Sequence, residues 1–199
     1  MTTDQLIDKK HITAITYFVQ IDSTDIDEVT KCVKSYKPFV DRFIVIQNND
    51  GKVYESIRQL ADIYIVNKVN KLMAGGVNEG YRIASAFKDT EYLLFIDSGT
   101  TAKDLDICAL CTDGIASPHI GSQEAGYLAH ASCFCVHKDT FERIGLWDSS
   151  FGNAADDDWF KRAKALGIPM YQTKDYVSHD SVRRDTGRVD EFNLLTEQL

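Results

Sequence analysis

Three consecutive aspartates, Asp156–Asp158, stand directly before a segment whose pattern predicts a helix. Apolar residues recur after them at helical spacing, at Trp159, Ala163 and Leu166. One aspartate is explained by capping of the helix start, and Asp158 is spaced to pair with Arg162 one turn later. A third adjacent carboxylate adds repulsion, which raises pKa values and is typical of sites that handle a proton or a cation. The cluster therefore predicts either a helix start or a catalytic site.

Four polar stretches follow strand-like apolar runs in the first half of the chain. They are QNND at 47–50, NKVN at 67–70, DSGT at 97–100 and the turn after TYFV at 16–19. If the runs form parallel strands, these turns lie at one edge of the sheet, where the ligands of such sheets bind. Each turn by itself is ordinary, because Asn, Asp, Gly and Ser are frequent in loops of any function. Together the four turns predict one crevice lined by polar side chains.

The elements that would position these turns alternate along the chain. Strands are expected at 12–19, 43–47, 62–66 and 92–96. Three helices are expected between them: one with Ile26, Val29, Val33 and Tyr36 behind a capping-box-like start at Thr24 and Asp27, one with Val53, Ile57 and Leu60, and one over 78–88. Because the strands are apolar throughout, this order predicts an α/β fold with a mostly parallel central sheet flanked by helices on both faces.

The second half is less regular. It predicts a strand at 130–136, a short helix at 138–145, the helix that follows the aspartates, a strand at 169–177 and a polar tail. The tail carries Arg183, Arg184 and Arg188, and the first two are able to bind phosphate or to be solvated. No low-complexity linker or repeat separates the halves, so the second half is expected to extend the same sheet in one domain spanning 1–199.

Composition excludes several classes of function. The 199 residues are 44% hydrophobic, enough for one good core, and the net charge of −8 argues against a nucleic-acid or anionic-membrane surface. The N-terminal stretch MTTDQLIDKKH has no apolar signal region, and runs such as YLLFI at 92–96 are too short to span a membrane. We therefore expect a soluble cytoplasmic protein with no integral membrane segment.

The five cysteines are an odd number and do not form a secreted disulfide framework, which favours a reducing compartment. Four of them have a zinc-like spacing, at Cys108, Cys111, Cys133 and Cys135. However, SCFCV alternates as a strand with both cysteines on one face, and DLDICALC is consistent with a helix. Buried free cysteines behave as small apolar residues, so a structural role is favoured over zinc.

Taken in order, several segments resemble the nucleotide-sugar glycosyltransferases of GT-A fold, in a family-2-like form. They are IVIQNND, GGVNEGYRIA, YLLFIDSG, CFCVHKDTFERIGLWDSSF, DDDWFKRAKALG and YVSHD. The resemblance covers about residues 12 to 180. It implies a single GT-A-type, Rossmann-like domain, with a nucleotide-sugar-binding half over 12–99, an acceptor and catalytic half over 100–180 and a polar tail over 181–199.

The resemblance implies a donor site made of seven residues: Tyr17, Gln47, Asn48, Asn78, Asp97, Ser98 and Gly99. Asp97 matches the first aspartate of the family's D-x-D motif, which holds a divalent metal, Mn or Mg, on the diphosphate. The motif here is Asp97-Ser98-Gly99, without the second aspartate. Gln47 stands where the family has an aspartate that reads the base, and an amide offers both a donor and an acceptor. Asn78 matches an asparagine at a helix start near the donor, where its alternative role is a helix cap.

The resemblance also implies the catalytic group. Asp156 aligns with the aspartate of the family's Glu-Asp motif, and Ala155 replaces the glutamate. Asp156 or Asp157 would then be the general base that takes the proton of the acceptor hydroxyl. His179, in YVSHD, matches a late histidine that some relatives place on the metal or the diphosphate, although a lone histidine is also frequently structural.

The function implied is transfer of a sugar from a nucleoside-diphosphate donor to a glycan, lipid or protein hydroxyl, by metal-assisted inverting displacement. The chain is short for the family, so a second subunit of a homo-oligomer is one way to complete the acceptor site. Compact proteins of this kind occur in viruses as well as in cells, and for a viral protein the compartment would be the host cytoplasm. The alternatives are a sugar-nucleotide-binding or scaffold protein without activity and a nucleotidyltransferase, although TYFVQIDSTD lacks the latter's glycine-rich basic loop.

Overall fold

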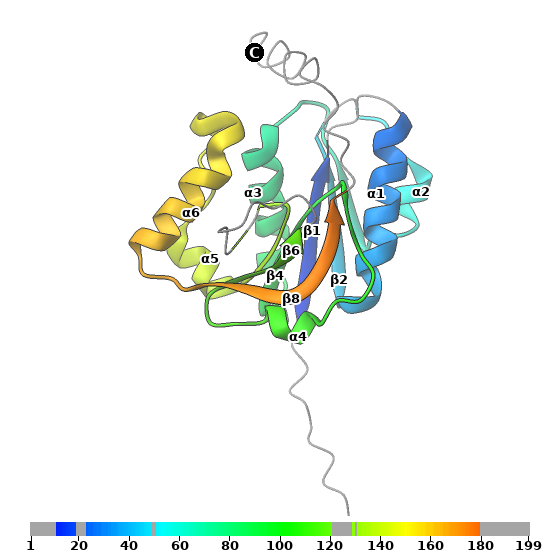
Figure 1. Cartoon of the computed structure of the whole chain (residues 1–199). Helices are drawn as coiled ribbons and strands as arrows, with labels where there is room; N and C mark the ends of the chain where they lie inside the picture. The colour runs from blue at the N-terminus through cyan, green and yellow to red at the C-terminus, as the bar shows by residue number, and fades with distance from the viewer. Residues whose placement is uncertain (1–10, 19–22, 49–50, 121–128, 130, 180–199) are drawn as a thin grey trace, which may run out of the picture.

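The computed structural model of the chain describes residues 11–18, 23–48, 51–120, 129 and 131–179. Within them, one eight-stranded sheet runs between two layers of helices (Figure 1). The strands are β1 (Ile12–Phe18), β2 (Arg42–Gln47), β3 (Ile63–Val66), β4 (Tyr92–Asp97), β5 (Thr100–Ala102), β6 (Ile115–Ile120), β7 (Cys133–His137) and β8 (Met170–His179). Their spatial order is β3-β2-β1-β4-β7-β6-β8-β5.

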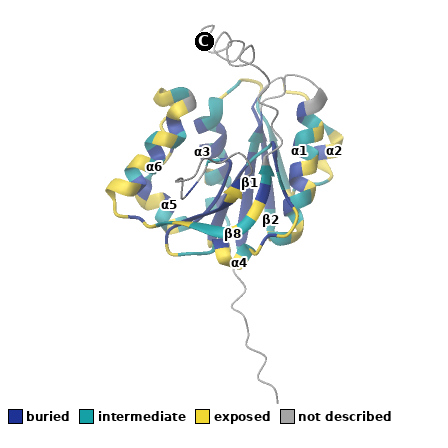
Figure 2. Cartoon of the chain, viewed as in Figure 1, coloured by how far each residue is buried: buried dark blue, intermediate teal, exposed yellow. Residues whose placement is uncertain are grey.

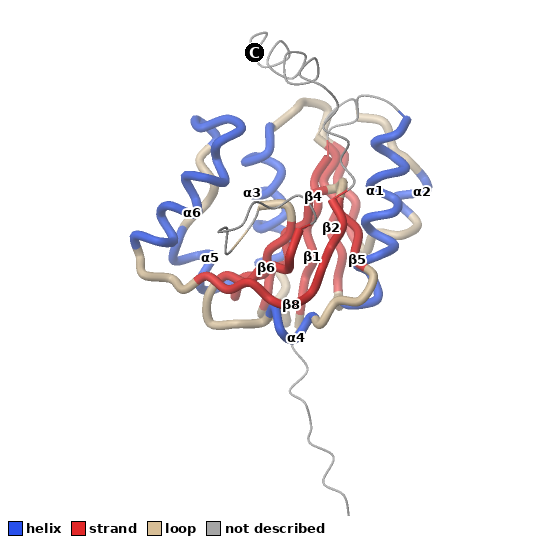
Figure 3. The backbone as a smooth tube through the Cα atoms, viewed as in Figure 1, coloured by secondary structure: helices blue, strands red, loops and turns tan. Residues whose placement is uncertain are grey.

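In the same described residues, six α-helices and two short 3₁₀ segments connect the strands. They are α1 (Ser23–Tyr36), α2 (Glu55–Arg58), α3 (Leu72–Ser85), α4 (Ile107–Leu110), α5 (Lys138–Ile144) and α6 (Ala155–Ala165), with η1 (Lys37–Phe39) and η2 (Ser149–Ala154). Helices α1 and α2 cover one face of the sheet, and α3, α5 and α6 cover the other (Figures 1 and 3). The predicted α/β class with helices on both faces is confirmed.

The first half of the chain forms the parallel part of the sheet. Strand β1 pairs in parallel with β2 on one side and with β4 on the other, and β2 pairs in parallel with β3. All four strands therefore end at the same edge of the sheet, which we call the carboxyl edge. Parallel neighbours are joined by crossover connections, so the turns that follow these strands gather at this edge, as the sequence predicts.

Beyond β4 the direction changes. Strand β7 is antiparallel to β4, β6 is antiparallel to β7, and β8 is parallel to β6 and antiparallel to β5. The long strand β8 returns to the carboxyl edge, where its last residue, His179, pairs with Thr100 of β5 (Figure 3). The second half thus extends the same sheet, as expected.

Two apolar cores lie on the two faces of the sheet, and Figure 2 shows the dark buried stripe between the helix layers. The α1-side core includes Val29, Val33, Phe43, Val45, Leu94 and Cys135. The α3-side core includes Ile15, Val77, Phe95, Phe134, Phe141 and Trp159. Alternate residues of each central strand enter opposite cores, as strand geometry requires, so the central strands are apolar on both faces.

Several element boundaries differ from the sequence prediction. Helix α2 is a single turn. Val53, expected on its buried face, instead lies in the preceding loop with 52% of its surface exposed. Helix α3 begins at Leu72 rather than near Asn78. Its first turns contain Gly75 and Gly76, whose low helix propensity hides the helix from sequence analysis. Packing against the sheet compensates for this, because Gly76 permits a close approach to Tyr17 of β1.

Strands β5 and β6 are not apparent from the sequence. Strand β6, IASPHI, contains Pro118, and its pairing with β8 shifts register between Ser117 and His119. Proline has no N–H for the ladder, so a strand that contains one survives only at such an irregularity or at an edge. The expected strands at 130–136 and 169–177 are found as β7 and β8 with shifted ends. The Thr24 side chain of the predicted capping box with Asp27 lies outside the described residues.

Gly80 tests the tight packing of α3 on β1. A Cβ at this position would lie 2.3 Å from Cγ2 of buried Ile15. Gly80→Ala is therefore expected to lose about 1–3 kcal/mol of unfolding free energy from overpacking, although Gly to Ala within a helix normally stabilises. Urea denaturation measures the effect, with exposed Arg82→Ala on the same helix as the control. A stabilised Gly80→Ala variant would contradict the close approach.

Candidate active site

The candidate site is built on the ends of β1 and β4. Tyr17 and Asp97 are register partners on these adjacent strands. Tyr17 packs against the α3-side core, and so does Phe95, two residues before Asp97. Because strand side chains alternate, Asp97 also points to the α3 side, next to the Tyr17 ring. A phenol and a carboxylate thus share one face of the sheet at the carboxyl edge.

Asp97 begins a tightly bonded turn between β4 and β5. Its Oδ1 accepts the Gly99 N–H at 2.9 Å, and the Thr100 hydroxyl donates to the Asp97 carbonyl at 2.9 Å. The Asp97 N–H donates to the Ser132 carbonyl at 2.7 Å. The Asp97-Ser98-Gly99 turn is therefore fixed on both sides, and Asp97 itself is half-buried.

Buried polar groups support this turn from the α1 side. The Tyr36 hydroxyl donates to Thr100 Oγ1 at 3.3 Å and contacts Cys133 Sγ at 3.6 Å, and Cys32 Sγ lies 3.7 Å from the Asp97 carbonyl. Burial raises the pKa of Tyr36 strongly above its ordinary value, and the neighbouring Cys133 adds to this. Burial also raises the pKa of Cys133 to about 12. These groups are neutral at physiological pH and act as structural supports of the turn.

The three aspartates of α6 have three different environments. Asp156 is half-buried and Asp157 is exposed. Asp158 accepts a 2.8 Å hydrogen bond from Arg162 Nε, the pairing that its spacing predicts. The N-cap residue of α6 is Ala154, which has no side-chain cap bond, so none of the aspartates occupies the capping position.

Asp156 is the aspartate of α6 whose charge influences Tyr17 in the candidate site. Burial of the Tyr17 phenol raises its pKa well above the ordinary value, and the charges of Asp97 and then Asp156 raise it further. Tyr17 therefore lies close to both carboxylates, one from β4 and one from α6. The fold thus brings the charges of two aspartates that are far apart in the sequence to bear on one phenol.

An irregular segment, residues 144–147, sets the position of α6. Arg162 Nη1 donates to the Ile144 carbonyl at 2.7 Å and Nη2 donates to the Leu146 carbonyl at 2.8 Å. Trp159 Nε1 donates to the Gly145 carbonyl at 2.9 Å. Side chains of α6 thus satisfy three consecutive backbone carbonyls, which fixes the helix start that carries Asp156.

Asn78 bonds to the same segment from α3. Its Nδ2 donates to the Trp147 carbonyl at 2.8 Å, and its Oδ1 accepts the Trp147 N–H at 2.9 Å. The expectation that Asn78 lies at a helix start is wrong, because α3 begins at Leu72. Its amide is occupied on both sides by backbone, so in this structure Asn78 joins α3 to the segment before α6.

Gln47 and Asn48 are fully buried at the end of β2. Gln47 Nε2 donates to the Lys52 carbonyl at 3.1 Å, and its Oε1 accepts the Tyr64 hydroxyl. By strand alternation Gln47 faces the α1 side, like Phe43 and Val45 and opposite to Tyr17. The amide expected to read a base is thus engaged within the protein.

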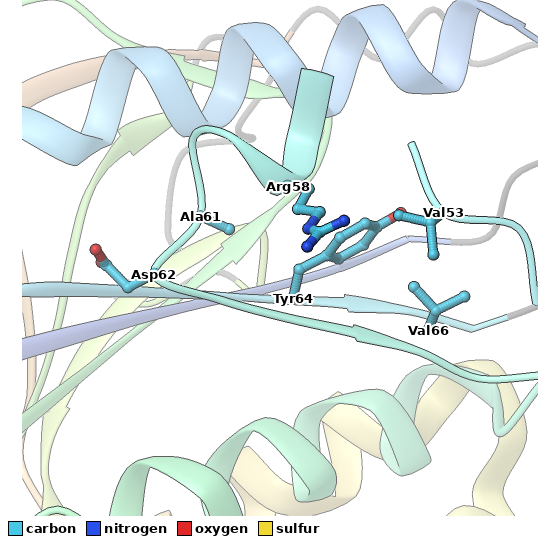
Figure 4. Close-up of a pocket in the computed structure, with 6 residues that line it drawn as sticks. All are labelled: Val53, Arg58, Ala61, Asp62, Tyr64 and Val66. Carbon is cyan, nitrogen blue, oxygen red and sulfur yellow. The ribbon is translucent and has the colours of Figure 1, made fainter. Parts of the chain in front are cut away.

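A pocket of about 340 Å³ lies around Tyr64, the partner of Gln47, rather than at the candidate site (Figure 4). Its lining comprises Val53, Arg58, Ala61, Asp62, Tyr64 and Val66. Tyr64 belongs to the α1 side of the sheet, whereas Tyr17 and Asp97 face the α3 side. This pocket is therefore separate from the Tyr17, Asp97 and Asp156 group.

The two predicted metal ligands, Asp97 and His179, belong to strands that end at the carboxyl edge. The register of β5 and β8 places His179 opposite Thr100, three residues after Asp97, although its side chain lies outside the described residues. Arg183 and Arg184 also lie outside them. In the part of the chain that is described, no three His, Cys, Asp or Glu side chains are grouped to hold a metal ion. Asp97 is thus a single carboxylate at this position, and a cation held there would need further oxygens from a bound molecule.

The cysteines of the zinc-like pattern lie partly in the α1-side core and partly at the surface. Cys133 and Cys135 are buried on one face of β7, as their alternation predicts, and Cys108 is exposed on α4. A hydrogen bond with Cys111, together with burial, raises the pKa of Cys135. Asp106 caps α4, as its side chain accepts the Cys108 and Ala109 N–H groups. Of the four residues of the zinc-like pattern, three thus lie in or against the α1-side core, and Cys108 lies at the surface.

Other residues of the site carry no sequence signal of their own. Tyr36 reads as one residue of an amphipathic helix, Ser132 as a strand residue and Trp147 as part of a loop. Only Arg162 was detectable, through its spacing from Asp158. Their roles depend on partners that are distant in the sequence.

Comparison with known proteins rests on structure alone. No family model matches the sequence, and no curated protein matches it. Among solved structures, the chain is similar to a mannosyltransferase from Pyrobaculum calidifontis in complex with GDP-Man and Mn²⁺, with a TM-score of 0.70 and 15% identity. The fold is that of a GT-A glycosyltransferase. The match covers 92% of this chain and 60% of the mannosyltransferase, so the protein spans well under two thirds of that longer chain.

This fold has no membrane-crossing helix in the ranges that the structure describes, because none of the helices there is both long and apolar enough.

The expected GT-A-type arrangement is confirmed. The family-2 form of the resemblance and a viral source stay predictions.

Tyr36 provides a test of the support beneath the Asp97 turn. Burial raises the pKa of Tyr36 in the folded protein above that of an unfolded tyrosine, which is about 10. Above that pH the unfolded chain loses a proton that the folded chain keeps, so stability falls as pH rises. Tyr36→Phe is expected to flatten this alkaline decline by up to about 1.4 kcal/mol per pH unit. Urea unfolding between neutral pH and pH 11 measures it, and parallel curves for both proteins would contradict the assignment.

Proposed function

We propose that this protein is a glycosyltransferase that transfers a sugar from a nucleoside-diphosphate donor to an acceptor hydroxyl. The observation that supports this best is the meeting of Tyr17, Asp97 and Asp156 at the carboxyl edge of a GT-A-type sheet. The structural similarity to an enzyme solved with GDP-Man and Mn²⁺ favours a nucleotide sugar as the ligand. We propose GDP-mannose as the first donor to test.

Asp97 would hold a divalent cation, Mn²⁺ or Mg²⁺, together with the diphosphate of the donor. One carboxylate at the edge of the sheet fits this arrangement, because such cations are commonly bound by one or two carboxylates plus substrate phosphates. His179 would approach the same edge from β8. The cation would supply neutralisation of the negative charge that grows on the departing diphosphate. The Gly99 N–H would keep the Asp97 carboxylate in position through its 2.9 Å bond to Oδ1.

Asp156 would act as the general base. As the acceptor oxygen forms its bond to the anomeric carbon, the bond from that carbon to the diphosphate breaks, and the proton of the acceptor hydroxyl passes to the Asp156 carboxylate. Direct displacement of this kind inverts the anomeric centre. Asp157 is a weaker candidate than the sequence alone indicates, since it is exposed, and Asp158 is engaged by Arg162. Tyr17 would lie near both Asp97, which binds the donor, and Asp156, which acts as the base.

A sugar-nucleotide-binding protein without turnover is the second candidate. Two observations favour it: Gly99 stands where the metal-binding motif has its second aspartate, and Ala155 replaces the glutamate beside the base. Binding of a nucleotide sugar without product formation, in the presence of a broad acceptor panel, would identify this function.

Asp97→Asn is expected to abolish metal-dependent donor binding. Calorimetry and thermal shift would be performed with GDP-mannose, UDP-sugars and dTDP-sugars, with and without Mn²⁺. For the native protein, a donor present at 100 times its Kd should stabilise the fold by about 2.7 kcal/mol. The variant should show no Mn²⁺-dependent part of this gain, because its amide carries no charge. The control is Asp89→Asn, which removes a carboxylate at the opposite edge. If no nucleotide sugar stabilised the native protein, the assignment of the donor site would be wrong.

Asp156→Asn is expected to separate binding from chemistry. Loss of a general base typically costs 10²–10⁴-fold in rate, so kcat should fall by roughly 100-fold or more while donor Kd changes little. Asp157→Asn is the matched control on the same helix turn and should keep most of the activity. Product formation by mass spectrometry measures both. If Asp157→Asn were the inactive variant and Asp156→Asn the active one, the assignment of the base would be reversed.

A further inference from the structure

A polar network that runs from buried Asn48 to the surface joins the ends of β2 and β3 to the start of α3. Asn48 Nδ2 donates to the Leu72 carbonyl at 2.8 Å, and Asn48 Oδ1 accepts from Asn67 Nδ2 at 3.3 Å. Asn67 Nδ2 also donates to Glu79 Oε2 at 2.6 Å, and Lys71 Nζ donates to Glu79 Oε1 at 2.9 Å. Asn48 is fully buried, so both halves of its amide are committed to this network.

The network holds a strained backbone. Leu72 has φ of +59°, and among the described residues it is the one that is not glycine and has a positive φ. A residue with a Cβ is disfavoured there and persists only when its surroundings fix it. Asn48 fixes the Leu72 carbonyl, and Asn70 Oδ1 accepts the Leu72 N–H at 2.9 Å. Backbone strain of this kind is concentrated at functional sites.

The network also contacts the candidate active site. A Cβ on Gly76 would lie 2.9 Å from Asn48 Nδ2 and 2.9 Å from Tyr17 Cβ. The first turns of α3 are thus packed between the amide that holds Leu72 and the phenol beside Asp97. A shift of segment 67–72 would move α3 against Tyr17, because close-packed groups transmit displacement.

We infer that Asn48 is a positioning residue: it holds Leu72 in its left-handed conformation and thereby sets segment 67–72 and Tyr17 for the nucleotide part of the donor. This inference rests on the proposed function, and it assigns donor contact to the segment rather than to the Asn48 amide. The segment lies at the carboxyl edge, where it follows β3 as the Asp97 turn follows β4.

The experiment uses the full chain and three variants: Asn48→Ala, Leu72→Gly and the double variant. Asn48→Ala should lower Tm by about 2–6 °C and weaken GDP-mannose binding roughly 10-fold, with donor KM raised and kcat nearly unchanged. Glycine adopts a positive φ without support, so Leu72→Gly should restore part of the Tm and of the affinity in the Asn48→Ala background. Calorimetry, thermal unfolding and steady-state rates give the three readouts.

The matched control is Thr90→Ala at the opposite edge of the sheet. Thr90 is buried and its hydroxyl lies 2.8 Å from Thr13 Oγ1, so its loss should also lower Tm. The affinity of Thr90→Ala for GDP-mannose should nevertheless equal that of the native protein. A donor Kd in Asn48→Ala equal to that of the native protein would overturn the positioning role, and so would additive Tm effects of Asn48→Ala and Leu72→Gly. If the native protein bound no nucleotide sugar, the proposed function would fail and the positioning role would fail with it.

Discussion

The parallel pairing of β1 with β4 is the constraint on which the site depends. It places Tyr17 beside Asp97 and directs both to the α3 side of the sheet. Since α3 approaches β1 through Gly76 and Gly80, no bulky helix side chain separates it from that edge. The Asp97 carboxylate and the Tyr17 phenol thus have positions dictated by backbone pairing, which is more rigid than a loop.

The second half of the chain adds the other carboxylate. Its strands reverse direction after β4, and the chain returns over the α3 side as α5 and α6. The irregular segment 144–147 would leave backbone groups unpaired in a partly buried place, and Arg162, Trp159 and Asn78 satisfy them. The same bonds fix where α6 begins. Asp156 owes its place near Tyr17 to these structural side chains, and Asp158 contributes by holding Arg162.

Burial explains why polar residues at the carboxyl edge differ in role. A buried amide needs partners, and Gln47, Asn48 and Asn78 all find them within the protein. They therefore maintain the shape of the site. Asp97 and Asp156 are only half-buried, which suits the reactive roles proposed for them. The degree of burial thus separates the supporting amides from these two carboxylates.

The sequence by itself determined the α/β class, the parallel order of the first half and the polar turns at strand ends, because apolar periodicity and turn chemistry are local signals. It also determined the Asp158 and Arg162 pair, whose partners lie one helical turn apart. Only the tertiary structure decided that Asp156, rather than its neighbours, approaches Tyr17, and that the amides of Gln47 and Asn78 are engaged by the protein. It also revealed β6 and the early start of α3, where Pro118, Gly75 and Gly76 obscure the pattern. The physical reason is that these outcomes depend on which distant groups become neighbours and how much water each side chain keeps, and neither is encoded in local spacing.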